Sequence, residues 1–398
     1  MLYLFVRNHR LWLEGHRLGF LRLFEDVTFQ TTMATLLAWV IVLAMGSRTI
    51  AWLRKQKIGD NPTLDPPAAP QADLLKKGKH NVPTMGGILI IGAIAITVLL
   101  LADLSNFYVR MALVCLLWLG AVGAADDWLK LTVRRRELAA GTGQPLSRQG
   151  LTSLEKLLFQ IGLAIVLGVF TYGYGQNNQA SHTLFFPFVK QWHIILPTWA
   201  FICIGTIVLT GTSNAVNLTD GMDGLAGGCV AIASFTFVVL ALIAGSAEFR
   251  LGTRSLTDYL YLPHIVASDQ MAVLAGAMGG ACVGFLWFNC YPARVFMGDT
   301  GSLALGGLIG YIAIVIRQEL LLLIVGGIFV AEALSVMIQV SYFKLTRRRY
   351  GQGRRIFLKS PLHHHFEMRG WTETQVVVRF WLIGAMLAMM ALATVKIR

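Results

Sequence analysis

Long apolar segments recur along this whole sequence and constrain its fold more than any other feature. A helix needs about 20 mostly apolar residues to cross a bilayer, and by that rule the 398-residue chain contains ten candidate spans. Only 14% of the residues are charged, against about 25% in ordinary soluble domains. The sequence therefore predicts an all-α polytopic integral membrane protein, one transmembrane domain over residues 1–398. The spans are centred near Leu37, Ala95, Leu116, Leu163, Ile204, Phe237, Gly279, Gly310, Val330 and Met386.

Basic residues are distributed unevenly between the loops that would join these spans. Most of the 34 Lys and Arg residues fall in the loops after the first, third and ninth spans, whereas alternate loops hold few, chiefly Lys190, Arg250 and Arg254. Basic residues in short loops remain cytoplasmic, so the loops that follow odd-numbered spans are predicted to face the cytoplasm. The formal charge of +13 would attract anionic lipid headgroups or an anionic soluble substrate; we expect no nucleic-acid partner.

The first 26 residues disagree with this orientation. Four arginines precede the first span, on the side predicted to be external, and they alternate with leucine and phenylalanine: Arg7, Arg10, Arg17 and Arg22. This pattern predicts an amphipathic segment that lies in the membrane interface. The five cysteines show no C-x-x-C spacing, so neither a disulfide framework nor a zinc site is expected.

Adjacent carboxylates at Asp126 and Asp127 lie where an apolar run gives way to the basic stretch 130–136. Consecutive side chains on a helix point in different directions, so each acid needs its own partner. A charged helix end would explain a single Asp, but anions are disfavoured at a helix C-terminus. Lys130, Arg134 or a bound metal would supply the compensating cation.

A second polar string, NAVNLTDGMDG, spaces Asn214, Asn217, Asp220 and Asp223 by three residues. If this backbone is roughly helical, all four side chains share one face. The alternative is a glycine-bearing link in which Asp223 starts the next helix as a cap. A cap would account for one acid and leave the others unexplained.

Asp299 lies between Gly298 and Gly301 in the string FMGDTGS, ahead of another span that Ser302 would cap. The flanking glycines allow close approach of the backbone to a ligand. Mg²⁺ prefers oxygen ligands and takes one or two carboxylates together with substrate phosphates, whereas zinc would need nitrogen or sulfur. Three acid clusters on one predicted surface therefore favour Mg²⁺.

Several further residues are candidates for substrate contact, and some of them have a structural explanation as an alternative. His363, His364 and His365 follow Pro361 in a basic loop and suit contact with phosphate or sugar. Lys79 and Thr84 precede the two glycines of KHNVPTMGG. The alternative interpretation of this string is an ordinary helix start with a proline near the first turn. No P-loop or dinucleotide motif is present. Glu332 falls in mid-span, where acids are usually functional, but we expect a structural role because no other acid shares its depth.

At these residues the chain closely resembles the phospho-N-acetylmuramoyl-pentapeptide transferase family, within the polyprenyl-phosphate N-acetylhexosamine-1-phosphate transferases. The likeness extends in order over nearly the whole chain and departs at Asn81 and Val82 and in the long segment 134–150. The matching strings are PTMGG (83–87), DD (126–127) with Lys130, NAVNLTDGMDGLA (214–226), FLWFNCYPARVFMGDTGSLALGG (285–307) and PLHHHFEMRGW (361–371).

The resemblance implies transfer of phospho-MurNAc-pentapeptide from its UDP carrier to undecaprenyl phosphate in the bacterial inner membrane, giving lipid I and UMP. It also implies ten spans, cytoplasmic catalysis, Mg²⁺ and a homodimer. Asp299 would be the Mg²⁺ ligand and Asp126 and Asp127 the catalytic pair. The nucleotide-sugar pocket would comprise Lys79, Thr84, Asn214, Asn217, Asp220, Asp223 and Phe296, with Phe296 stacked on uracil, while Lys130 and the three histidines contact phosphate or sugar.

Two mechanisms and two rival functions stay open. Asp126 would act either as a nucleophile that becomes phosphorylated or as the base for direct attack by the lipid phosphate, and we expect direct attack. A related transferase would use another UDP-N-acetylhexosamine. A proton-coupled transporter would also have many spans, but transporters place their binding groups near the bilayer midplane, whereas these acids are predicted at one surface.

Overall fold

The computed structural model describes residues 1–16, 18–56, 82–140, 150–175, 179–189, 192–245, 250–251, 254–255, 257, 260 and 262–395, with the backbone alone described for 134–140, 250–251 and 254–255. Lys79, Asn81 and the proline-containing segment 59–71 lie outside this part. Helices dominate the described residues. The helices are α1 (Leu2–Asn8), α2 (Arg10–Gly15), α3 (Val27–Lys55), α5 (Gly87–Leu101), α6 (Phe107–Ala140), α7 (Ser153–Tyr174), α8 (Thr198–Thr219), α9 (Leu225–Gly245), α11 (Gln270–Asn289), α12 (Gly298–Val315), α13 (Glu319–Val325), α14 (Gly327–Tyr350), α15 (Leu362–Met368) and α16 (Glu373–Thr394).

Short elements complete the chain. Two 3₁₀ helices, η1 (Gly19–Glu25) and η4 (Gln179–His182), and two antiparallel hairpins accompany the long helices. One hairpin pairs β1 (Thr183–Phe185) with β2 (His193–Ile195), and Leu184 lies opposite Ile194. The other pairs β3 (Arg250–Leu251) with β4 (Arg254–Ser255). Neither hairpin extends beyond two strands.

Nine of the described helices are long and apolar enough to cross a membrane. The apolar helix α5 has 15 residues and lies where the span near Ala95 was predicted. The prediction of an all-α, multi-pass membrane protein is confirmed. The region predicted as one span around Val330 is instead two helices, because the backbone breaks at Gly326 between α13 and α14.

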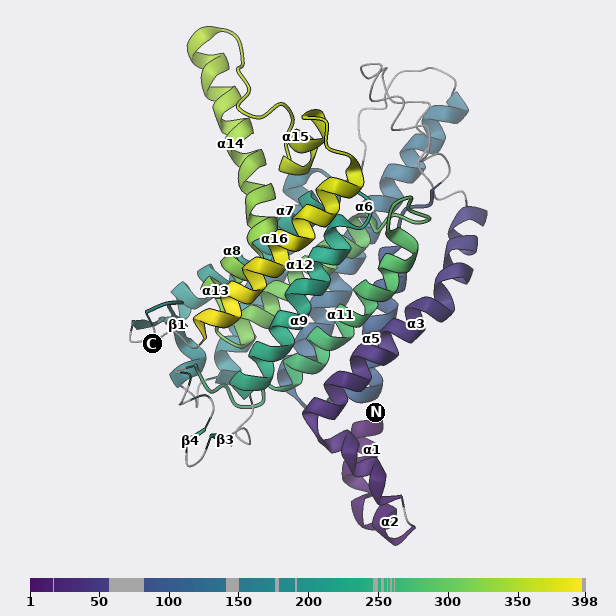
Figure 1. Ribbon diagram of the computed structural model, residues 1–398, viewed down its shortest axis with the longest axis vertical. Coiled ribbons are helices and arrows are strands. Elements are labelled where there is room, and N and C mark those ends of the chain that lie inside the picture. Colours follow the sequence, from purple (N-terminus) through teal and green to yellow (C-terminus); the bar gives the residue numbers. More distant parts are fainter. Residues whose placement is uncertain are drawn as a thin grey trace.

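Helices α11 and α12 form the centre of the bundle, where 83% and 89% of their spans are buried. Glycines allow their neighbours to approach closely: a Cβ at Gly280 of α11 would lie 2.0 Å from the Thr35 carbonyl oxygen of α3, and one at Gly306 of α12 would lie 2.5 Å from the Thr212 carbonyl oxygen of α8. These glycines therefore serve packing within the bundle. The other helices surround this pair (Figure 1).

The helix ends are specified locally. Asp26 caps α3 by accepting from the Phe29 N–H at 2.8 Å. Thr152 and Glu155 form a capping box at the start of α7, and Thr372 and Gln375 form one at the start of α16. These signals are readable in the sequence and fix where two of the outer helices begin.

The two ends of the bundle differ. We call the end at which α15 lies the acid end, because His363 of α15 packs against the loop that carries Asp220, and Asp220 lies close to Asp299. The end that carries the β-hairpins is the hairpin end (Figure 1). The helices α1 and α2 project beyond the start of α3, and the far end of α14 stands clear of the other helices.

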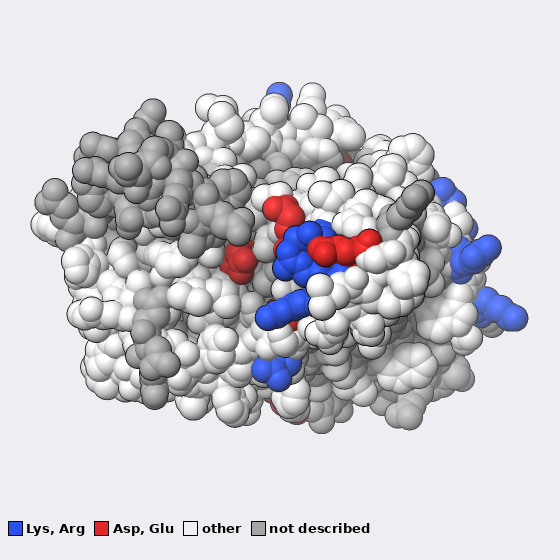
Figure 2. All heavy atoms as spheres, turned by 90° about the horizontal axis from the view of Figure 1, so that it is seen from below, with Lys and Arg blue, Asp and Glu red and all other residues white. Residues whose placement is uncertain are grey.

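The N-terminal segment mixes charge with exposed apolar side chains. Glu14 pairs with Arg22 at 2.7 Å and with Arg10 at 3.8 Å, while Leu11 is 85% and Phe20 64% exposed. Figure 2 views the molecule from the side on which α1 and α2 project, where charged residues form a small mixed patch on a mostly uncharged surface. This composition suits the predicted interfacial position, which stays a prediction.

Candidate active site

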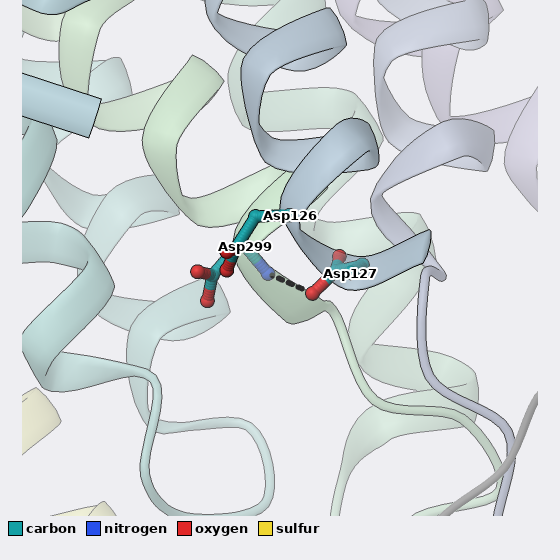
Figure 3. A group of neighbouring side chains, drawn as sticks. All are labelled: Asp126, Asp127 and Asp299. Carbon is teal, nitrogen blue, oxygen red and sulfur yellow. Dashed lines mark hydrogen bonds between the residues drawn. The ribbon is translucent and has the colours of Figure 1, made fainter. Parts of the chain in front are cut away.

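Three aspartates from two helices meet at the acid end. Asp126 and Asp127 come from α6 and Asp299 from the first turn of α12, and one carboxylate oxygen of each lies within 4.8 Å of the others. Asp126 and Asp127 are buried and Asp299 is half-buried. Figure 3 shows Asp126 and Asp299 side by side and Asp127 directed toward the backbone of α12.

Asp127 caps α12 from a different helix. Its Oδ1 accepts from the Asp299 N–H at 3.2 Å, and its Oδ2 accepts from the Thr300 N–H at 3.0 Å and the Thr300 hydroxyl at 2.7 Å. The first N–H groups of a helix have no partner within it, and the helix dipole favours an anion there. The expectation that Ser302 caps this helix is wrong, because Ser302 donates instead to the Gly298 carbonyl. Asp127 thereby fixes where Asp299 lies relative to α6.

Asp126 faces two lysines. Its Oδ1 accepts from the Leu151 N–H at 2.7 Å, and its Oδ2 lies 2.6 Å from Lys130 Nζ and 2.7 Å from Lys156 Nζ. The same ammonium groups lie 3.1 and 2.6 Å from Asp299 Oδ2. Both lysines therefore bridge both carboxylates, and their charges stabilise two acids that would otherwise repel.

Lys156 is the site residue that the sequence analysis missed. It lies in the first turn of α7, directly after the capping box. In the sequence it is one of several basic residues in the loop after the third span. Gln160, one turn later, donates to Ser213 Oγ at 3.0 Å and accepts from Asn214 Nδ2 at 2.6 Å. The capping box was the available signal, because it starts a helix that places residues 156 and 160 on one face.

The string that carries Asn214 and Asn217 is only partly helical. Helix α8 ends at Thr219. The expected common face therefore includes the two asparagines, whereas both aspartates lie beyond the end of the helix. Asn217 Nδ2 donates to Asp299 Oδ1 and to Ser302 Oγ, each at 2.9 Å. Asn217 thus holds the side of Asp299 that the lysines do not occupy.

The two acids beyond α8 take different positions. Asp223 is buried and accepts from the Ala293 N–H at 3.0 Å. Its own backbone N–H donates to Glu373 Oε1 at 2.9 Å, which ties the loop to α16. Asp220 is half-buried and hydrogen-bonds the Gly298 backbone. Burial, followed by the charges of Asp299 and Asp127, raises the pKa of Asp220 to about 8. Asp220 therefore lies close enough to Asp299 and Asp127 for their charges to disfavour its ionisation.

The glycine-rich segment before α5 docks onto the segment that leads into α12. The Phe296 N–H donates to the Pro83 carbonyl and the Phe296 carbonyl accepts from the Gly86 N–H, each at 2.8 Å. A Cβ at Gly298 would lie 3.0 Å from Thr84 Oγ1, so Thr84 lies beside the start of α12. Thr84 and the half-buried Phe296 thus border the aspartate cluster.

The three histidines have different surroundings. His363 is buried, and both its N–H and its Nδ1 face Glu332 Oε1, at 3.1 and 3.2 Å. A Cβ at Gly221 would lie 2.3 Å from His363 Nε2, so this ring packs against the loop that carries Asp220. His364 lies 2.9 Å from Glu367, and His365 Nδ1 accepts from the Leu358 N–H. Glu332 therefore holds α15 against α14, consistent with a structural role.

The aspartate cluster suits a hard divalent cation. Its three donors are carboxylate oxygens, with no His or Cys in the group, which is the donor chemistry that Mg²⁺ prefers. Two ammonium groups lie against Asp126 and Asp299, so a bound cation would share these carboxylates with Lys130 and Lys156. The donor chemistry of the cluster fits a magnesium site.

A multi-pass helical bundle that gathers acids and lysines at one end has the features of a membrane enzyme for anionic substrates. Residues 109–317 match the model of glycosyl transferase family 4, which is more than half of the chain, and the chain belongs to this family. Members transfer a sugar 1-phosphate from a nucleotide-sugar donor to polyprenyl phosphate and are generally dependent on a divalent metal. The match includes the aspartate cluster and Lys156 but neither Thr84 nor the histidines.

Proposed function

We propose that the chain transfers phospho-MurNAc-pentapeptide from UDP-MurNAc-pentapeptide to undecaprenyl phosphate, forming lipid I and UMP. This would be the first membrane step of peptidoglycan synthesis, and the acid end would face the cytoplasm of a bacterial inner membrane. The observation that carries the proposal is the Asp126–Asp299 pair, which Lys130 and Lys156 bridge and which Asp127 positions by joining α6 to α12.

The proposed roles follow from these contacts. Asp299, with Asp126 beside it, would hold Mg²⁺, which when bound neutralises charge on the donor pyrophosphate. Lys130 and Lys156 would hold the phosphates of the two substrates, and Asn217 would keep Asp299 oriented. Burial of Asp126 and partial burial of Asp299 and Lys156 strengthen their electrostatic effect, because water screens these charges less.

Asp126 is the proposed base in a direct transfer. An oxygen of undecaprenyl phosphate attacks the phosphorus bonded to the sugar, the bond to UMP breaks, and UMP leaves with the electron pair. Asp126 takes any proton carried by the attacking phosphate. Incubation with radiolabelled donor alone distinguishes the alternative, because an acid-stable label transferred to Asp126 would show that the residue acts as a nucleophile.

The remaining substrate contacts are proposals from the position of each residue. Thr84, Asp220, Asp223 and Phe296 lie on or against residues 293–298, the segment that leads into α12. They would form the nucleotide-sugar pocket, with Phe296 against the uracil. His363 of α15 packs against the loop that carries Asp220, and His364 and His365 would reach the sugar or its phosphate. Lys79, assigned to this pocket by resemblance, lies outside the described residues.

The decisive experiment measures UMP release in nanodiscs that contain undecaprenyl phosphate. UDP-MurNAc-pentapeptide and UDP-N-acetylglucosamine are supplied in parallel, each with Mg²⁺ and with EDTA. We expect Mg²⁺-dependent UMP release from the muramoyl donor alone. Release from UDP-N-acetylglucosamine alone would identify the related transferase, and uptake of donor into vesicles without UMP release would support the transporter.

A further inference from the structure

The last turns of α14 and the segment after them carry a group of cations that the proposed reaction does not use. We define residues 344–359 as the cationic hook. Residues 333–366 contain no Asp or Glu, so the hook has no neutralising acid in its own sequence. Its basic residues are Lys344, Arg347, Arg348, Arg349, Arg354, Arg355 and Lys359.

The hook is an ordered turn and holds its cations together. Gly351 takes φ +74° and ends α14, and the chain then returns along the helix. Gln339 Oε1 accepts from the Ile356 and Phe357 N–H groups at 3.1 and 3.0 Å, and Thr346 Oγ1 accepts from the Arg354 N–H at 2.9 Å. The arginines of residues 347–349 and of residues 354–355 are thus kept on adjacent stretches.

These arginines have no acidic partner in the part of the chain that the structure describes. All five are exposed, and two of them lie over the Tyr350 ring, with Cζ of Arg349 at 5.5 Å and Cζ of Arg354 at 5.0 Å from its centroid. Like charges at this spacing repel. An external anion would therefore relieve repulsion that the hook itself cannot relieve.

Exposed apolar side chains are interleaved with the cations. Leu345 is 62%, Leu358 50% and Ile356 49% exposed. The same helix qualifies as a membrane span of which only 28% is buried by protein, and Met337, two turns earlier, is 63% exposed. An apolar helix that ends in arginines leaves the hydrocarbon at the hook, in the layer where lipid headgroups lie.

We propose that the cationic hook binds anionic phospholipid headgroups in the leaflet at the acid end. A soluble nucleotide-sugar is the less suitable occupant, because binding it would leave the interleaved leucines and isoleucine in water. The far end of α14 also stands clear of the bundle that contains the aspartates (Figure 1). The hook would thus anchor α14, a helix that the rest of the protein covers only sparsely.

The test compares binding of phosphatidylglycerol and phosphatidylcholine with identical chains to the full-length protein in detergent, by native mass spectrometry. Wild type should bind phosphatidylglycerol more tightly, and less so at high salt. Each cation near an anionic surface contributes about fivefold, so the triple variant R347Q/R348Q/R349Q should lose at least about tenfold in affinity for phosphatidylglycerol. The charge-preserving variant R347K/R348K/R349K should keep the preference.

A second variant, R354Q/R355Q, lies outside any helix and should show a smaller loss even if the triple variant folds poorly. Unchanged phosphatidylglycerol affinity in the folded Gln variants would overturn the proposal. So would a Gln variant that retains the lipid preference but binds UDP-MurNAc-pentapeptide more weakly, because the soluble donor would then be the occupant. These binding measurements need no transferase activity, so they stand apart from the proposed reaction.

Discussion

At the scale of single residues, adjacent aspartates have separate tasks. Asp126 faces two lysines, whereas Asp127 bonds the backbone of another helix. Neutral substitutions at these two positions should therefore have different consequences for stability, although both lie in the same turn of α6.

Asp127→Ala should lower the free energy of unfolding by about 1–2 kcal/mol, the usual cost of a lost helix cap, and should also impair transfer. Thermal unfolding in nanodiscs measures the first effect. Thr300→Val serves as the partial control, because it removes the hydroxyl donor and retains the N–H that Asp127 also accepts. Equal stability of wild type and Asp127→Ala would contradict the capping role.

Asp299→Asn should abolish Mg²⁺-dependent UMP release and also the rise in unfolding temperature that bound Mg²⁺ gives wild type. The amide keeps the shape of the side chain and loses its charge. Isothermal titration calorimetry measures Mg²⁺ binding directly and needs no substrate. Full Mg²⁺-dependent activity in this variant would remove Asp299 from the metal site.

Lys156→Gln should lower kcat by about a hundredfold, as loss of a preorganised charge donor does in other active sites, with little change in unfolding temperature. Lys130 remains to bridge Asp126 and Asp299, so the fold should persist. Lys55→Gln, on the exposed end of α3, is the matched control and should be fully active. If the kcat of Lys156→Gln equalled that of Lys55→Gln, Lys156 would have no part in transfer.

At the scale of elements, contact between α6 and α12 determines the spacing of the acids. A Cβ at Gly123 of α6 would lie 2.2 Å from the Asp299 carbonyl oxygen. The helices can come this close only because residue 123 has no side chain, and one turn later the same helix presents Asp126 and Asp127.

Gly123→Ala should force α6 away from α12 and cost about a hundredfold in kcat, since displacements of about 1 Å have effects of that size. Circular dichroism should show unchanged helix content. Gly92→Ala on α5, where an added Cβ would meet nothing within 4 Å, should leave the rate at the wild-type level. A rate unaffected by Gly123→Ala would mean that α6 can adjust without moving its aspartates.

At the scale of the whole molecule, the apolar segments were enough to predict the fold. The aspartates at the borders between apolar spans and polar loops were enough to predict much of the candidate site. Asp126, Asn217 and Asp299, far apart in sequence, lie together as their positions at span ends suggested. The cap from Asp127 was not readable, because its partner is the backbone of a distant helix. Lys156 was missed because a lysine after a capping box is ordinary at a membrane surface.

The two-lysine bridge between Asp126 and Asp299 has built-in redundancy. Either ammonium group alone spans both acids, so loss of one lysine leaves the charge of the pair partly compensated and the fold intact, even where transfer slows. Loss of both would remove the two ammonium groups that the described residues place against these acids. The loss of stability should therefore be strongly synergistic, a signature that a double-mutant cycle of unfolding temperatures detects and single variants do not.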